Sequence, residues 1–463
     1  MGGKFCRYCG LPTANTSARF CRGCGKPLAA PARLQTTAPA RRRNTYWVRH
    51  ACALGLLLGT LLVALVTVFR WEAGRERPVV SAPPATALPA DEDGEAPGYA
   101  SSGEPVISIG YRADGRFGVR TTEGDPARQD DDNKLLTFSP SGDTSNTRLW
   151  VDGDTPIIGS GGTWRRPPGQ EGERIAASWE YRGVRVDQNL KLIAVATGKP
   201  RDTMRVEYTL RNTDTRPHAV GVRAMIDTLI GNNDGVPFVV PGRVGVTTTA
   251  CEMEGEKVPE FVQALETGEL TNPGVIVRIT LRDGEKRPDR VVLSGWAGGD
   301  MPWEYLAALG GTGASLRRGG NGEPDSAIGI YYSPRTLAPG AKRKVAFYYG
   351  LGGVSSTKSR NARLSLSCAP RVREGESFQV VALVSSPRPG DRLRLSPGEG
   401  LALAANEPEE RAVPPAEGQA FTQVSWVVTA QRARPQAELT ATLMPASVAE
   451  TLEVEIAPGT LTR

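Results

Sequence analysis

Four cysteines near the N-terminus have the spacing of a metal centre. Cys6 and Cys9 form one Cys-x-x-Cys pair, Cys21 and Cys24 form a second, and eleven residues separate the pairs. A glycine follows each pair and gives the backbone the freedom that a tight turn needs, so all four thiolates can converge on one tetrahedral zinc ion. Two disulfides or redox dithiols are the alternatives. Because so short a segment has almost no apolar core, its folding would depend on the metal.

Acidic turn sequences are the second group of residues with potential chemistry. They are 130–133 (Asp-Asp-Asp-Asn), 152–154 (Asp-Gly-Asp) and 232–235 (Asn-Asn-Asp-Gly). Calcium binds such oxygen ligands, but none of the three fits the twelve-residue EF-hand loop, and ordinary β-turns use the same residue types. A pair of carboxylates could also cleave a glycosidic bond if the two faced each other. The sequence leaves turns, calcium and paired acids open, with turns favoured.

Other residue types with potential chemistry are scarce. The chain has only two histidines, His50 and His218, which leaves little material for a histidine general base or a histidine-rich metal centre. Cys251 and Cys368 could form a disulfide in an oxidising compartment, but we favour two buried thiols. Five tryptophans could stack on sugar rings where exposed, although such residues more often fill a core: Trp150, Trp164, Trp179, Trp296 and Trp303.

An uncharged apolar run at 51–69 divides the chain. As a helix its nineteen residues would be about 28 Å long, close to the thickness of a hydrocarbon core, so we expect a transmembrane helix. Residues 1–50 carry ten lysines and arginines and no acidic residue, whereas the rest of the chain sums to −4. The positive-inside rule therefore places the N-terminus in the cytoplasm and the C-terminal part outside. A cleaved signal peptide is the competing interpretation.

Two segments around the span have the composition of linkers. Residues 29–50 are rich in Pro, Ala, Thr and Arg, and include Arg41, Arg42 and Arg43. These arginines either contact anionic lipid headgroups or act only as a topology signal, and nucleic acid is a less favoured partner. Residues 70–104 are rich in Pro, Ala and acidic residues and predict an extended spacer.

Beyond the spacer, alternating apolar and polar residues predict antiparallel β-structure. Strands are expected near 106–109, 184–194, 205–210, 219–228, 274–282, 289–296, 327–333 and 343–350. Helical spacing appears only at Val258, Phe261, Val262 and Leu265, and at Trp303, Leu306 and Ala307. We expect a large β-sandwich over 105–353. About seven further strands over 361–459, with Trp426 as core aromatic, predict a second sandwich.

Three resemblances to known families follow from these residues. Lys4 to Leu28, with Phe5 and Phe20 before the first cysteine of each pair, resembles the N-terminal zinc-ribbon module of bacterial membrane proteins, which implies a structural zinc over residues 1–28. Residues 361–459 resemble a bacterial immunoglobulin-like domain. The middle region is similar, in size and run of strands, to the galactose-mutarotase-like sandwiches, whose members bind or process sugars. That group's usual catalytic histidines have no counterpart beyond His218.

The expected fold is mainly β, with a zinc ribbon, one transmembrane helix, a large antiparallel β-sandwich and an immunoglobulin-like sandwich. The favoured function is a non-enzymatic, single-pass membrane protein whose exported domains bind a ligand or protein partner. One alternative is a membrane-tethered carbohydrate-binding or carbohydrate-active protein using paired carboxylates. The other is a transmembrane sensor with a nucleic-acid-binding cytoplasmic arm.

Overall fold

The computed structural model describes residues 104–122, 131–282, 286–298, 301–318, 322–417 and 419–459, which belong to one compact unit. The fold class is mainly β, as expected. Within the described ranges no helix is both long enough and apolar enough to span a bilayer. The expected span at 51–69 and the four N-terminal cysteines lie outside those ranges.

The first sandwich consists of an eight-stranded and a five-stranded antiparallel sheet. The eight-stranded sheet has the order β4 (Thr163–Glu171), β5 (Arg174–Tyr181), β6 (Val184–Ile193), β7 (Thr203–Asn212), β15 (Lys342–Leu351), β12 (Ile276–Thr280), β11 (Phe261–Leu265) and β9 (Phe238–Val239). The five-stranded sheet has the order β10 (Cys251–Glu254), β13 (Arg290–Ser294), β14 (Ser326–Leu337), β8 (His218–Thr228) and β3 (Asn146–Val151). A two-stranded sheet joins β1 (Ile107–Tyr111) to β2 (Phe117–Thr121).

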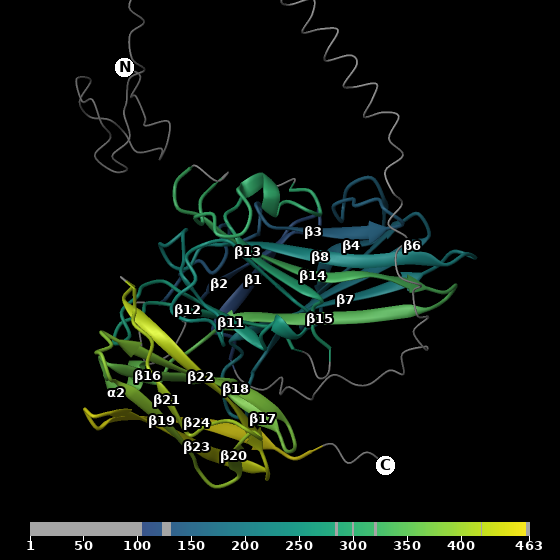
Figure 1. Ribbon diagram of the computed structural model, residues 1–463. Coiled ribbons are helices and arrows are strands. Elements are labelled where there is room, and N and C mark those ends of the chain that lie inside the picture. Colours follow the sequence, from purple (N-terminus) through teal and green to yellow (C-terminus); the bar gives the residue numbers. More distant parts are fainter. Residues whose placement is uncertain are drawn as a thin grey trace, which may run out of the picture. The chain divides into compact units, whose positions relative to one another are not determined.

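The two large sheets lie face to face, with β3, β8 and β14 in one layer and β7 and β15 in the other (Figure 1). Alternation along each strand explains this layering. On β6, Val184, Val186 and Leu190 are buried in the core between the sheets, and the alternating residues Arg185, Asp187 and Asn189 point outward. Because β8 is buried on both faces, its sequence is a nearly continuous run of apolar residues.

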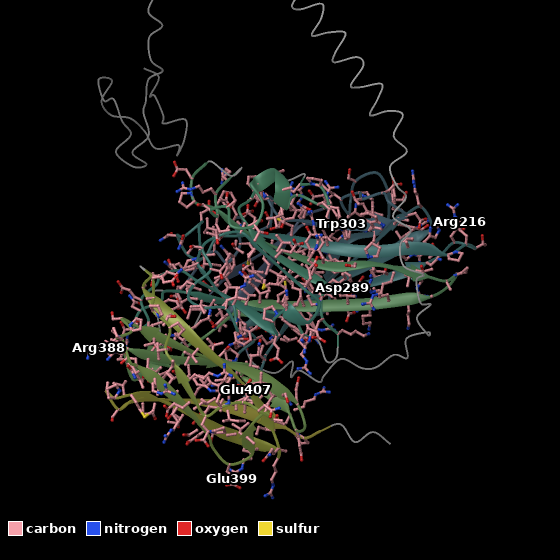
Figure 2. All side chains as sticks on the ribbon, viewed as in Figure 1. Arg216, Asp289, Trp303, Arg388, Glu399 and Glu407 are labelled. Carbon is pink, nitrogen blue, oxygen red and sulfur yellow. The ribbon has the colours of Figure 1, made fainter. Side chains whose placement is uncertain are left out.

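The outer face of the five-stranded sheet is covered by residues 296–298 and 301–318, which we call the covering segment. Its aromatic side chains form a second apolar layer, in which Trp303 makes edge contacts with Trp150 and Tyr331. Figure 2 labels Trp303 beside this sheet. Arg223 of β8 is fully buried beneath the segment and donates a hydrogen bond to the backbone carbonyl of Pro302 at 2.7 Å. The covering segment also contains a short 3-10 helix, η2 (Leu306–Leu309).

The second sandwich contains nine described strands, where the sequence suggested about seven. One sheet has the order β16 (Leu364–Cys368), β18 (Ser377–Ser385), β22 (Phe421–Ala430) and β20 (Leu401–Leu403). The other has the order β17 (Arg371–Arg373), β24 (Val448–Ala457), β23 (Arg434–Met444), β19 (Arg392–Pro397) and β21 (Glu410–Ala412), with β17 parallel to β24. Trp426 is buried in the core between these sheets, as predicted.

The two sandwiches share an apolar interface that the sequence did not predict. It joins the outer faces of β9, β11 and β12 to the outer face of β18 and the start of β22. The buried residues are Val239, Val246, Phe261, Leu265, Leu270, Ile276, Val354, Val381, Leu383 and Phe421. A single-turn helix, α2 (Ser356–Ser359), lies in the segment between the sandwiches. Contact through a closed apolar surface of this kind resists relative motion of the domains.

Both helices expected in the first sandwich need correction. Residues 261–265 form strand β11, and the only helix nearby is the three-residue η1 (Gly255–Lys257). Phe261 and Leu265 point toward the second sandwich, while Val262 points into the first core. Because both faces of the strand are buried, its apolar residues have a spacing that resembles one face of a helix. At the second position only Leu306–Leu309 is helical, and Trp303 precedes it. Cys251 and Cys368 are buried free thiols in separate cores.

Candidate functional site

The sequence-predicted site residues are scattered. The zinc cysteines lie outside the described residues, as does Asp130. The other acidic sequences form turns: Asp152 and Gly153 both have positive φ, and the Asn233 side chain accepts a hydrogen bond from the backbone N–H of Gly235 at 3.0 Å. Turn chemistry therefore accounts for their local structure. One member of these sequences, Asp234, also takes part in a cluster that joins distant parts of the chain.

Three carboxylates converge where β8 meets β14. Thr228 pairs with Ser326 in the antiparallel ladder, which brings Asp227, near the end of β8, beside Asp325, just before β14. Asp234 approaches from the loop that follows β8, where its backbone carbonyl accepts a hydrogen bond from the Ser326 hydroxyl at 2.9 Å. One carboxylate oxygen from each aspartate lies within 4.8 Å of the others. The sheet register thus assembles a triad of Asp227, Asp234 and Asp325.

A single arginine lies against this triad. Nε of Arg318 donates a hydrogen bond to Oδ2 of Asp325 at 3.0 Å, and its Nη2 lies 3.7 Å from Oδ2 of Asp234. The guanidinium also lies over the ring of Trp296, 5.3 Å from the centroid, in a cation–π contact. The Trp296 indole N–H in turn donates to the backbone carbonyl of Thr144 at 3.0 Å. Three negative charges therefore face one positive charge.

Burial strongly disfavours three ionised carboxylates at this point. The side chains of Asp227 and Asp325 are fully buried, and Asp234 is partly exposed. Burial and the charge of Asp325 raise the pKa of Asp227 to about 8. Burial raises the pKa of Asp325 to about 6, although the hydrogen bond from Arg318 opposes the shift. Burial also raises the pKa of Asp234. The triad thus needs a further positive charge or a bound proton.

The triad does not have the geometry of a glycosidase. Glycoside cleavage needs two carboxylates on opposite sides of a sugar ring, about 5 Å or more apart and open to substrate. Here two of the three aspartates have no exposed surface, and all three lie within 4.8 Å. A sugar ring cannot be placed between them, whereas a single cation or proton can.

His218 occupies a second charged arrangement at the other end of β8. Its Nδ1 lies 2.6 Å from Oδ2 of Asp152 and its Nε2 lies 3.0 Å from Oδ2 of Asp214. The imidazole is fully buried, and both neighbours are carboxylates that can only accept when ionised. Each ring nitrogen is thus held by one carboxylate. Since neither nitrogen faces an open cavity, His218 links the turn after β3 to the β7–β8 hairpin rather than serving as a base.

Two polar depressions lie on strands β4 to β6. One of about 470 Å³ is lined by Gly161, Gly162, Thr163, Arg165, Glu180, Tyr181 and Arg182. The other, of about 440 Å³, is lined by Arg165, Arg166, Arg174, Ser178, Asp187 and Asn189. Arg165 belongs to both depressions. We call this pair of depressions the arginine face, since four arginines and two acidic residues line it.

The predicted tryptophans do not line the arginine face. Trp179 and Trp303 are buried, while Trp150, Trp164 and Trp296 are half-buried and pack against the apolar clusters. This agrees with the expectation that such residues fill a core.

Sequence reasoning missed Asp227, Asp325 and Arg318. A signal for Asp227 was present, because it interrupts the apolar run Ala-Met-Ile-Asp-Thr-Leu-Ile at 224–230. A charged residue inside a fully buried strand needs a partner, and that requirement marks it for attention. The partner itself was not visible, since it depends on the register between β8 and β14.

Comparisons with known proteins identify no family. No family model and no curated protein matches the chain. Among solved structures, a galactose mutarotase-like protein from Lactobacillus casei ATCC 334 is 12% identical with a TM-score of 0.27, and the match covers 55% of this chain and 100% of that one. A protein described as a kojibiose phosphorylase, from the human microbiome, is 6% identical with a TM-score of 0.23, over 53% of this chain and 25% of that one.

A third similar structure is Escherichia coli alpha-2-macroglobulin activated by porcine elastase, which is 10% identical with a TM-score of 0.16, over 78% of this chain and 44% of that one. The first of these structures carries the name of the group that the run of strands in the middle region suggested. Identities and TM-scores at this level name neither a ligand nor a reaction for this chain.

Proposed function

We propose that this chain is a single-pass membrane protein whose two exported β-sandwiches form a rigid module that binds an acidic glycan on the arginine face. In this proposal residues 1–28 hold a structural zinc in the cytoplasm through Cys6, Cys9, Cys21 and Cys24, and residues 51–69 anchor the chain. The sequence patterns support the anchor and the zinc. The arginine face supports the ligand class.

The charge of the arginine face is the observation that carries the proposal. Arg165, Arg166, Arg174 and Arg182 line the two depressions with Glu180 and Asp187, so the lining has a formal charge of +2, while Glu171 and Asp154 pair with three of these arginines from outside the lining. A guanidinium offers five N–H donors in a planar fork that matches a carboxylate. An acidic polymer therefore fits this surface better than a neutral one.

The existing ion pairs leave donors for a ligand. Arg165 pairs with Glu180 at 2.9 Å, and Arg166 and Arg174 share Glu171 at 2.9 and 3.1 Å. Side-chain exposures of 42 to 53% keep the three guanidinium groups in water. Surface pairs of this kind contribute only about 0–1 kcal/mol. Replacing these glutamate partners with ligand carboxylates therefore costs little free energy. Without a ligand, the same glutamates hold the arginine side chains in a defined geometry.

The second sandwich determines which part of the eight-stranded sheet is open. It packs on the outer faces of β11 and β12, whereas the outer faces of β4, β5 and β6 carry polar side chains and the two depressions. The docked sandwich thus restricts ligand binding to one half of a single sheet face. Sites on paired strands hold their side chains more rigidly than sites on loops.

The test compares polygalacturonate with the same polymer carrying methyl-esterified carboxyl groups, using the full chain purified in detergent. We expect binding to the acidic form only, and weakening of that binding as salt is raised. The double variant Arg165→Gln and Arg174→Gln should reduce affinity at least about tenfold, since each lost charged hydrogen bond contributes about 1.5–3 kcal/mol. Arg388→Gln, an exposed arginine of the second sandwich, is the matched control.

Two results would overturn the glycan proposal. One is equal binding of the acidic and esterified polymers, which would show that the arginines do not select charge. The other is unchanged affinity in the double variant while the protein stays folded, which would place the binding site elsewhere.

A further inference from the structure

We infer that the triad of Asp227, Asp234 and Asp325 is a calcium site that ties the β8–β14 ladder to the loop after β8. The inference is independent of the glycan proposal, because the triad shares no residue with the arginine face. Its starting point is a fully buried carboxylate that has no charged partner and no hydrogen bond of normal geometry from the protein.

Asp227 is the observation that points to a ligand. Its side chain is fully buried, and neither Oδ1 nor Oδ2 receives a hydrogen bond. Buried carboxylates are normally satisfied by several donors, and an unsatisfied one is strongly destabilising. Two further carboxylate oxygens nearby also lack a donor, Oδ1 of Asp325 and Oδ1 of Asp234, and the Thr144 hydroxyl is the side-chain donor beside Asp227. Four carboxylate oxygens thus share at most one neutral donor in the same small region.

The distances fit a calcium ion. Calcium binds oxygen at about 2.4 Å, so two ligands on opposite sides of one ion lie up to about 4.8 Å apart. One carboxylate oxygen from each aspartate of the triad lies within 4.8 Å of the other two. Magnesium prefers shorter bonds of about 2.1 Å and a stricter octahedron, and zinc prefers nitrogen and sulfur. The hard oxygen set therefore favours calcium.

The charges also balance with a divalent ion. Three carboxylates and Arg318 sum to −2, and one Ca²⁺ brings the group to zero. Arg318 alone cannot do so, because it reaches Asp325 at 3.0 Å and Asp234 at 3.7 Å, while both oxygens of Asp227 have no donor. Removing two uncompensated charges from water would cost several kcal/mol per ion, so a compensating ion has a large driving force.

The ion also has a route to the site. Asp234 is 28% exposed and Arg318 is 48% exposed, so the triad opens to solvent on that side. Bound calcium would connect Asp234, in the loop, to Asp227 and Asp325, in the sheet. Because Asp227 lies in β8 and Asp325 directly precedes the neighbouring β14, calcium should stabilise this end of the first sandwich in particular.

The experiment measures calcium binding to the full chain in detergent, by equilibrium dialysis with ⁴⁵Ca and by thermal unfolding with and without calcium. We expect one calcium per chain and an unfolding temperature raised by a few degrees at saturation. Asp227→Asn keeps the shape and one oxygen ligand but removes the negative charge, and it should weaken binding at least about tenfold because the ion then faces one carboxylate fewer.

Two further variants keep the test decisive if Asp227→Asn folds poorly. Asp234→Asn changes a partly exposed ligand and should also weaken binding and reduce the thermal shift. Asp143→Asn is the control, because Asp143 lies next to Thr144 in sequence but pairs with Arg112 at 2.9 Å. The N-terminal thiolates do not confuse the measurement, since calcium prefers oxygen ligands.

The alternative occupant is a proton on Asp227, and it makes the opposite prediction. In that case the Asn side chain mimics the protonated acid, so Asp227→Asn would unfold at the same temperature as the parent protein. Calcium would then change the unfolding temperature of neither protein. That result, or calcium binding that survives in both Asp227→Asn and Asp234→Asn, would overturn the inference.

Discussion

Nη2 of Arg278, on β12 of the first sandwich, donates a hydrogen bond to the backbone carbonyl of Cys368, on β16 of the second, at 2.6 Å. The same nitrogen also donates to the Ser367 hydroxyl at 2.8 Å, and the guanidinium lies over the ring of Phe261, 3.9 Å from its centroid. Burial lowers the pKa of Arg278 to about 10, which leaves it charged at neutral pH. A buried cation thus joins the two sandwiches through neutral acceptors.

The first prediction is that Arg278→Met destabilises the joined sandwiches by about 2 kcal/mol. Methionine fills similar volume but leaves the Cys368 carbonyl without its donor, and a lost bond to a charged donor costs about 1.5–3 kcal/mol. Urea unfolding monitored by tryptophan fluorescence measures the change. Arg388→Met, at an exposed position, should stay within about 0.5 kcal/mol of the parent. Equal stabilities of the two variants would show that the Arg278 contacts contribute nothing.

The second prediction concerns Phe421, which is fully buried in the apolar interface between the sandwiches. Phe421→Ala removes a large side chain there and should cost about 3–5 kcal/mol. Because each sandwich keeps its own core, we expect one calorimetric transition for the parent protein and two for the variant. Trypsin should also cut faster at Lys358 and Arg360, in the segment between the sandwiches.

Phe378→Ala is the matched control for Phe421. Phe378 is equally buried but belongs to the core of the second sandwich. Its loss should weaken that sandwich without exposing the shared interface, so cleavage at Lys358 in the native state should stay slow. If both variants give the same cleavage rate, the interface is not a separate stabilising unit.

The positions of most strands could be predicted because many of them have one face exposed to solvent, which produces an alternation of apolar and polar residues in the sequence. On β6 and β7 the apolar residues alternate with charged ones, and the expected ranges match the observed strands within a few residues. The prediction failed at β11, where Phe261 and Val262 are buried on opposite sides. The second sandwich buries the outer face of β11, so the strand has apolar residues on both faces. The local sequence therefore lacks the alternation of apolar and polar residues that marks a strand.

The triad could not be predicted for a related reason. Asp234 was selected among turn residues, but its neighbours Asp227 and Asp325 are 98 residues apart and meet only through the β8–β14 register. Sequence patterns locate strands but do not fix the register between distant ones. The arginines of the arginine face were similarly unremarkable in sequence, because their grouping depends on the pairing of β4, β5 and β6.

The third prediction is that Asp152 stabilises the protein above about pH 4. Burial opposes its ionisation, but hydrogen bonds from His218 and from the Ala219 backbone N–H outweigh burial and lower the pKa of Asp152. A carboxylate with a lowered folded-state pKa contributes stability that is present above its unfolded value, near 3.8, and lost as the pH falls through the folded value. The contribution should therefore shrink below about pH 4.

Asp152→Asn tests this dependence by urea unfolding between pH 3 and 7. The difference in unfolding free energy between the parent and the variant should be constant from pH 5 to 6 and decrease toward pH 3. Glu399→Gln is the control, because Glu399 is 68% exposed in a surface pair with Arg434. A difference that does not change with pH would contradict the assigned role of Asp152.

The fourth prediction concerns the N-terminal cysteines and removal of their metal. If Cys6, Cys9, Cys21 and Cys24 hold a structural zinc, a peptide of residues 1–30 should fold with one zinc ion and unfold when a chelator removes it, because so short a segment lacks a core that could keep it folded. Circular dichroism and zinc analysis measure both effects. Cys21→Ser should lose most of the affinity, since a hydroxyl is a poor substitute for a thiolate ligand. A peptide whose spectrum is the same with and without chelator would contradict the zinc assignment and leave disulfides or free dithiols as the explanation.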